Sequence, residues 1–164
     1  MSKPLRLSYV TVALLHMAAA AVDRLEDVMP SSGVDPGPLP ALAEAISDAV
    51  GALADAGGVD SDDGRTVTAG ETRLILDSLV VGLDHAAALI PADLVTVPVP
   101  TWTYAVLAGV GALLARADGP VGVIAAALRA LADATRDGVV DAAELVAVIA
   151  AIRAAADAAI ADAA

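Results

Sequence analysis

The stretch DATRDGVVDAAEL, residues 133–145, gathers four acidic side chains around one glycine in a chain otherwise rich in Ala, Val and Leu. Two interpretations fit it: the stretch folds round a cation, or it is a tight turn between two helices that caps itself. Asp-Gly is a strong turn former, and Asp141 followed by Glu144 has the spacing of a helix N-cap that needs no metal. Both interpretations make this stretch the corner of a helical hairpin.

The same arrangement occurs earlier in the chain. The string ALADA stands at 52–56 and again at 130–134, and each copy leads into an acidic loop with Asp-Gly and then a Thr or Val stretch. Each loop ends in Glu at the start of another amphipathic helix, and Thr68 with Glu71 is predicted to form a capping box there. Two helix–loop–helix halves that bury each other's apolar faces would explain the repeat.

Apolar spacing and turn signals extend this pattern to an all-α fold of about six helices, with two EF-hand-like helix–loop–helix hairpins packed through Ala-rich faces. The predicted helices are 8–29, 40–57, 68–90, 101–115, 119–133 and 142–164. The predicted organisation is an N-terminal helix (1–29), a linker (30–40), a first helix–loop–helix unit (41–92), an extended Pro/Val connector (93–100) and a second helical unit (101–164) with the EF-hand-like loop. Valines alternate with Thr and Pro at 94–100, which predicts an edge strand.

Composition narrows the classes of function. Alanine supplies about a quarter of the 164 residues and aromatics 2%, so each residue offers little apolar area at about 25 cal/mol per Å² buried. Such a core needs close backbone approach between helices, or burial against other subunits. The net charge of −12 repels phosphate backbones and excludes nucleic-acid binding, whereas cations, basic partners or high salt suit it. The chain has no Cys, which excludes disulfides and thiol chemistry.

Two apolar segments imitate membrane or export signals. Lys3 and Arg6 precede an uncharged run, as in a signal peptide. The apolar spacing continues through Leu15, Val22, Leu25 and Met29, which favours a core helix.

The uncharged segment 94–115 contains prolines that leave about 22 Å of helix, whereas the hydrocarbon core of a bilayer is about 30 Å thick. We therefore predict a buried helix there and no membrane partner.

The second loop resembles the EF-hand calcium loop and, more loosely, the dockerin loop. That resemblance implies oxygen ligands at positions 1, 3, 5, 7, 9 and 12, a glycine at position 6 and a small β-contact between the paired loops at position 8. Gly138 stands at position 6 and Val140 at position 8. The implied ligands are Asp133, Thr135, Asp137, the carbonyl of Val139, Asp141 and Glu144.

The first loop matches less well, because Gly64 and Arg65 occupy positions 5 and 6. Its implied ligands are Asp60, Asp62, Thr66, Thr68 and Glu71. Calcium is the one cofactor that the resemblance implies. The alternative at both loops is a bare turn.

Residues for catalysis are scarce. His16 lies in an apolar helix, where a packed or helix-bonded side chain is expected and not a base. Asp84 and His85 are adjacent on a helix and do not face each other. P-loop, Rossmann and HExxH motifs are absent from the sequence. We therefore expect a protein that is not an enzyme.

The function that we predict is a structural or assembly subunit of a larger particle, with calcium in the EF-hand-like loops as an added staple. Its partners would be subunits of the same assembly, as a homo- or hetero-oligomer. A composition typical of high-GC coding makes a viral structural protein one candidate, in a virion or an intracellular assembly. The alternatives are a calcium-binding EF-hand-like module and a small membrane-active, holin-like protein.

Overall fold

The computed structural model of the chain describes residues 5–28, 39–56, 66–90, 96–98, 102–114 and 119–163. These residues form six helices and four short strands. In chain order they are β1 (Leu5–Arg6), α1 (Tyr9–Val28), α2 (Leu39–Ala56), β2 (Thr66–Val67), α3 (Ala69–Ala88), β3 (Thr96–Pro98), α4 (Trp102–Leu114), α5 (Gly119–Thr135), β4 (Val139–Asp141) and α6 (Ala142–Ala163). The predicted all-α fold with about six helices is confirmed, and each predicted helix is present to within a few residues.

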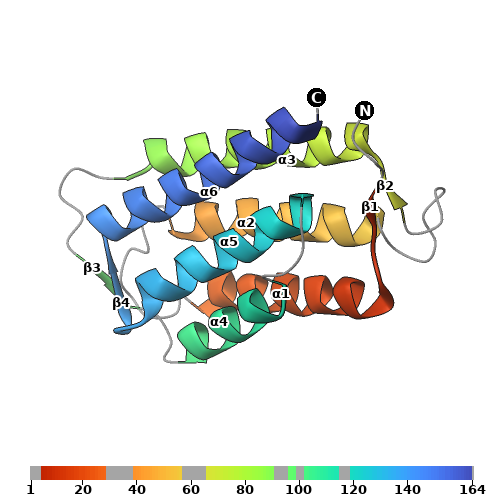
Figure 1. Cartoon of the computed structure of the whole chain (residues 1–164). Helices are drawn as coiled ribbons and strands as arrows, with labels where there is room; N and C mark the ends of the chain where they lie inside the picture. The colour runs from red at the N-terminus through yellow and green to blue at the C-terminus, as the bar shows by residue number, and fades with distance from the viewer. Residues whose placement is uncertain are drawn as a thin grey trace.

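The helices form three layers of two (Figure 1). Helices α2 and α5 make the middle layer, α1 and α4 cover it on one side, and α3 and α6 cover it on the other. The middle helices are therefore enclosed from both sides. In α5 this leaves apolar side chains buried on most of the helix surface, including Val121, Ile124, Leu128 and Leu131, as expected of a helix that is hydrophobic all round.

The chain consists of two halves with the same architecture. The order strand, helix, helix, strand, helix occurs twice, α1 packs on α2 as α4 packs on α5, and α2 packs on α3 as α5 packs on α6. The buried positions correspond as well. Three buried residues of each helix have the same spacing as three in its counterpart. The matched sets are Leu15, Ala18 and Val22 of α1 with Leu107, Val110 and Leu114 of α4; Ile46, Val50 and Leu53 of α2 with Ile124, Leu128 and Leu131 of α5; and Ile75, Leu76 and Leu79 of α3 with Val148, Ile149 and Ile152 of α6. A pseudo-twofold that crosses the three layers therefore relates the halves.

This repeat is larger than the one the sequence predicts. The prediction confines it to two helix–loop–helix units and leaves the N-terminal helix outside. In the structure α1 is the counterpart of α4, and β1 is the counterpart of β3. The sequence similarity between α1 and α4 is too low to reveal the match, because the two helices share a pattern of burial and few identical residues.

The short strands pair within each half and not between the halves. Leu5 pairs with Val67, and Val97 pairs with Val140, both in antiparallel ribbons. The strand predicted within 94–100 is confirmed as β3. The two ribbons lie at opposite ends of the molecule (Figure 1). Strands β2 and β4 therefore do not pair with each other, and the β-contact expected between the two EF-hand-like loops does not form.

Small residues allow the helices to approach closely. A Cβ added to Gly82 of α3 would lie only 2.6 Å from the Cβ of Ala45 in α2. A Cβ added to Gly111 of α4 would lie 2.9 Å from the Cγ of Arg129 and 3.4 Å from the Cβ of Leu128 in α5. The predicted close backbone approach therefore occurs at two places, each between a middle helix and an outer one.

The N-terminal segment is a core helix, as predicted. Leu15, Ala18 and Val22 are fully buried. Met29 and the side chain of Leu25, predicted on the same stripe, lie outside the described residues. Among the helices that the structure describes, none combines the length and apolar character needed to cross a bilayer.

Candidate functional site

The second acidic corner departs from the predicted calcium loop at its first positions. Helix α5 continues to Thr135, so Asp133 and Thr135 are helical and not part of a loop. Asp133 is exposed and forms an ion pair with Arg136, whose nitrogen is 3.6 Å from the carboxylate. Thr135 is buried, and its hydroxyl donates to the carbonyl of Ala132 at 3.0 Å. Neither side chain is directed toward the carboxylates further along the corner.

The end of this corner is a reciprocal helix cap. The backbone N–H of Glu144 donates to a carboxylate oxygen of Asp141 at 2.8 Å, and the backbone N–H of Asp141 donates to Glu144 at 2.9 Å. Each carboxylate thus satisfies a backbone donor that the first turn of α6 leaves free. Gly138 has φ of +82°, the left-handed conformation that glycine adopts without strain. The side chain of Asp137 accepts a long bond of 3.5 Å from the backbone of Val139.

The first corner repeats this cap. Thr68 is the N-cap of α3, its hydroxyl accepts from the backbone of Glu71 at 3.2 Å, and the Glu71 carboxylate accepts from the backbone of Thr68 at 2.8 Å. The capping box predicted here is confirmed. Thr66 pairs in β2, while Asp60 and Asp62 lie outside the described residues.

In the structure the second corner is a turn between two helices that caps itself, and the implied ligands do not converge on one point. Across the described residues, three or more His, Cys, Asp or Glu side chains are nowhere grouped so that they could hold a metal ion.

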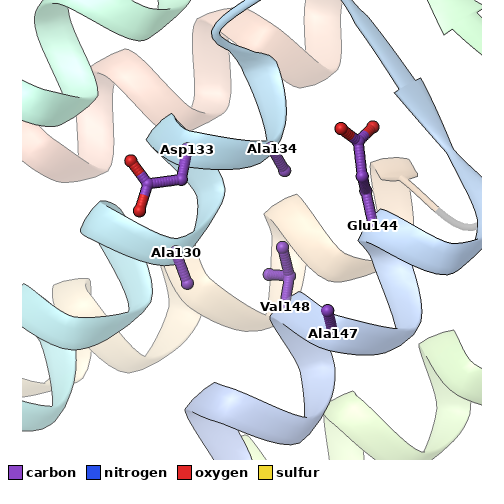
Figure 2. A pocket seen from close by; sticks show the side chains of 6 residues that line it. All are labelled: Ala130, Asp133, Ala134, Glu144, Ala147 and Val148. Carbon is purple, nitrogen blue, oxygen red and sulfur yellow. The ribbon is translucent and has the colours of Figure 1, made fainter.

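A shallow pocket of about 290 Å³ lies between α5 and α6 beside this corner. Figure 2 shows Asp133 at one end and Glu144 at the other, with their carboxylates pointing in different directions. Between them the wall consists of short apolar side chains: Ala130, Ala134, Ala147 and Val148. The pocket is therefore an alanine-lined surface with separated acids, and not a paired-carboxylate site.

The residue types that could support catalysis are dispersed. Of the two roles expected for His16, packing in the core is wrong, because its side chain is exposed on α1. His85 is exposed on α3, and its neighbour Asp84 forms an ion pair with Arg153 of α6 across the outer layer. Ser8 acts as a cap, since its hydroxyl accepts from the backbone of Thr11 at 3.1 Å.

A different surface stands out, and the sequence did not point to it. Helix α4, predicted to be buried, is buried on one side only: Leu113 is 67% exposed and Val106 is 37% exposed on its outer side. On the neighbouring α1, Val10 is 68% exposed and Met17 is 58% exposed. Seven residues separate the members of each pair, so each pair lies on one side of its helix. We call this surface of α1 and α4 the outer face.

The outer face is free of acidic side chains over its described length. Helix α4 contains no charged residue, and between Tyr9 and Arg24 the one acidic residue is Asp23. Asp23 accepts a hydrogen bond from Ser47 of α2, so it turns away from the face. In a chain of net charge −12, such a surface is exceptional.

A hollow of about 430 Å³ lies on the outer face between the two helices. Its walls are Ala20, Ala21 and Arg24 from the second half of α1, with Trp102 and Val106 from the first half of α4. Helices α1 and α4 run antiparallel (Figure 1), which brings these two halves together. The signal in the sequence was the lack of any charge across 102–114, since a helix that is apolar all round needs burial all round.

Searches of protein-family models, of curated proteins and of solved structures each returned no match to this chain. Its function therefore has to be inferred from its own residues and their geometry.

Proposed function

We propose that this chain is a non-catalytic structural subunit that assembles with other protein subunits. The single observation that carries the proposal is the outer face, where an apolar helix pair lacks a covering layer. Helices α3 and α6 cover the middle layer from the other side and also expose apolar side chains, namely Leu74, Val81 and Val146. Those side chains stand beside ion pairs, Arg73 with Asp77 and Asp84 with Arg153. The two outer layers thus differ in charge, and the uncharged one is the side on which we expect a neighbour.

The energetic reasoning rests on exposed area. A large aliphatic side chain contributes about 1.5–3 kcal/mol when it is fully removed from water. Val10, Met17 and Leu113 are each more than half exposed, and they share one surface with the alanines around the hollow. Contiguous apolar patches of this kind mark protein–protein or membrane contacts more often than scattered exposed residues do.

Membrane contact is the weaker proposal of the two. Amphipathic helices that lie on bilayers carry many Lys and Arg side chains beside the apolar stripe. Here Arg24 is the one such residue on α1 and α4 between Tyr9 and Leu114 in the parts that the structure describes. A virion or an intracellular assembly is the setting that we propose, on the strength of the alanine-lined core and the high-GC composition.

Calcium is a second candidate function at the second corner. Gly138 already has the positive φ that position 6 of an EF-hand loop requires. Binding would require the last turn of α5 to open, so that Asp133 could turn from Arg136 toward Asp141 and Glu144. On this proposal the cap is the metal-free state of the corner.

The assembly proposal is tested in a lysate of the cells that naturally produce the chain. The chain is separated by size-exclusion chromatography and detected by antibody, alongside the variant Leu113→Asp. We expect the wild type to elute in a species larger than the monomer and the variant to shift toward the monomer. Elution of the wild type as a monomer, both in the lysate and after purification, would refute the proposal.

A further inference from the structure

We propose that the partner seated on the outer face is a second copy of this chain, which forms a homodimer with the two α1–α4 layers stacked against each other. This inference rests on the proposed function and identifies its partner. Two observations carry it, the distribution of charge and the twofold arrangement of the face, and the size of the face sets the expected strength of association.

Charge selects a second copy over a basic partner. A basic protein would be attracted to the surfaces that hold the carboxylates, such as the exposed Glu44, Asp48 and Asp55 of α2. The outer face has no carboxylate to offer such a partner. Two copies of net charge −12 repel each other wherever acidic surfaces meet, and like charges across an interface oppose association. The acid-free outer face is the surface on which two identical acidic chains can come into contact.

Both ends of the face are apolar and compatible with a twofold contact. Helices α1 and α4 are related by the pseudo-twofold and run antiparallel, so Leu14 corresponds to Val106, Met17 to Gly109 and Ala21 to Leu113. Large and small side chains thus exchange places between the two helices. A twofold interface uses one patch on both subunits. A twofold in the plane of the layer would stack the two helices of one copy on the two helices of the other.

The size of the face predicts a weak dimer. Over Tyr9–Arg24 of α1 and the 13 residues of α4, the helices are about 24 Å and 20 Å long at a rise of about 1.5 Å per residue and a width of about 10 Å. Their flat projection is thus about 440 Å², and the corrugated accessible surface is larger. Stable specific interfaces bury about 800 Å² per partner, and weak ones bury less. The hollow beside Trp102 gives the second copy a recess for an aliphatic side chain such as Met17.

The test uses the purified full-length chain in sedimentation velocity from about 1 to 100 μM, at low and high NaCl. We expect a monomer–dimer equilibrium that strengthens with salt, because the Debye length falls from about 30 Å at 0.01 M to about 3 Å at 1 M. Met17→Asp and Leu113→Asp should each weaken dimerisation at least tenfold, since each places a carboxylate within the apolar contact. Circular dichroism checks that both variants keep the helical fold.

Leu74→Asp is the matched control. Leu74 is 72% exposed on α3 in the opposite layer, so its replacement adds the same charge away from the proposed contact, and dimerisation should be unchanged. A chain that stays monomeric throughout, or a dimer that Leu74→Asp weakens and Leu113→Asp does not, overturns this inference. A purified monomer that still elutes in a larger species in the lysate overturns the homodimer and leaves the assembly proposal standing. Association that weakens as salt rises also overturns the homodimer, because it indicates attraction between opposite charges.

Discussion

The contact between Gly82 and Ala45 yields a sharp test of the packing. The Cβ added by Gly82→Ala would lie 2.6 Å from the Cβ of Ala45, whereas carbon atoms in contact prefer about 3.5–4.0 Å. Overpacking of this kind costs about 1–3 kcal/mol, against a gain of about 0.5–1 kcal/mol for replacing glycine with alanine inside a helix. We therefore expect Gly82→Ala to lower the free energy of unfolding by about 1–2 kcal/mol, from overpacking less the helix gain.

A matched variant and a rescue separate the packing term from the helix term. A Cβ added to Gly51 of α2 would have no heavy atom within 4 Å, so Gly51→Ala should raise stability by about 0.5–1 kcal/mol. In the double variant Ala45→Gly with Gly82→Ala, the nearest remaining atom is the Cα of residue 45 at 3.5 Å, an ordinary contact. The double variant should therefore recover most of the loss.

Urea and thermal denaturation followed by circular dichroism measure these effects. A change of 1 kcal/mol moves Tm by about 2–4 °C in a domain of this size, so the differences are readily resolved. If Gly82→Ala is as stabilising as Gly51→Ala, or if the double variant is no more stable than Gly82→Ala alone, helices α2 and α3 do not approach as closely as the structure has them.

Three further predictions concern the two corners and the repeat. Thr68→Ala should lower the free energy of unfolding by about 1 kcal/mol through loss of the α3 cap. Glu144→Gln should leave stability nearly unchanged without metal, because Gln also serves in a capping box. If the second corner binds calcium, the same variant should abolish any rise in Tm with millimolar calcium. A calcium-dependent rise in Tm that survives in Glu144→Gln would place the ion elsewhere. Leu15→Ala and Leu107→Ala should lower the free energy of unfolding by similar amounts, each about 2–5 kcal/mol, because these fully buried residues occupy equivalent positions. Strongly unequal losses of stability in urea denaturation would argue against the pseudo-twofold.

The sequence predicts the helices well because their ends carry local signals. Thr68 and Glu71 cap α3 as their spacing requires, and the prolines near Pro98 produce an extended strand in place of helix. Such signals act through bonds between residues three or four apart, so neighbouring residues are enough to reveal them. The same locality explains why the whole repeat stayed hidden, since α1 and α4 resemble each other only in which positions the fold buries.

The candidate sites were harder to predict, because they depend on where helices end and which way they face. Ligand spacing alone could not show that α5 continues through Thr135, which the buried bond to Ala132 stabilises. In α1, which is apolar on most sides, spacing did not decide whether His16 faces the core or the solvent. The fold resolves that choice through its long-range contacts: Leu15 is fully buried, and the adjacent His16 is turned outward.

The contrast between α4 and α5 explains why we infer assembly from this fold. Both helices are apolar on nearly every side, and α5 is enclosed by the layers above and below it. Helix α4 has a layer on one side only, so its outer surface stays in water unless another molecule covers it. A polar side chain in place of Leu113 would cost an isolated chain little in packing, since this residue is already 67% exposed. An uncharged helix at that place, in a chain with 21 acidic residues, is most simply explained by a partner that keeps the surface dry.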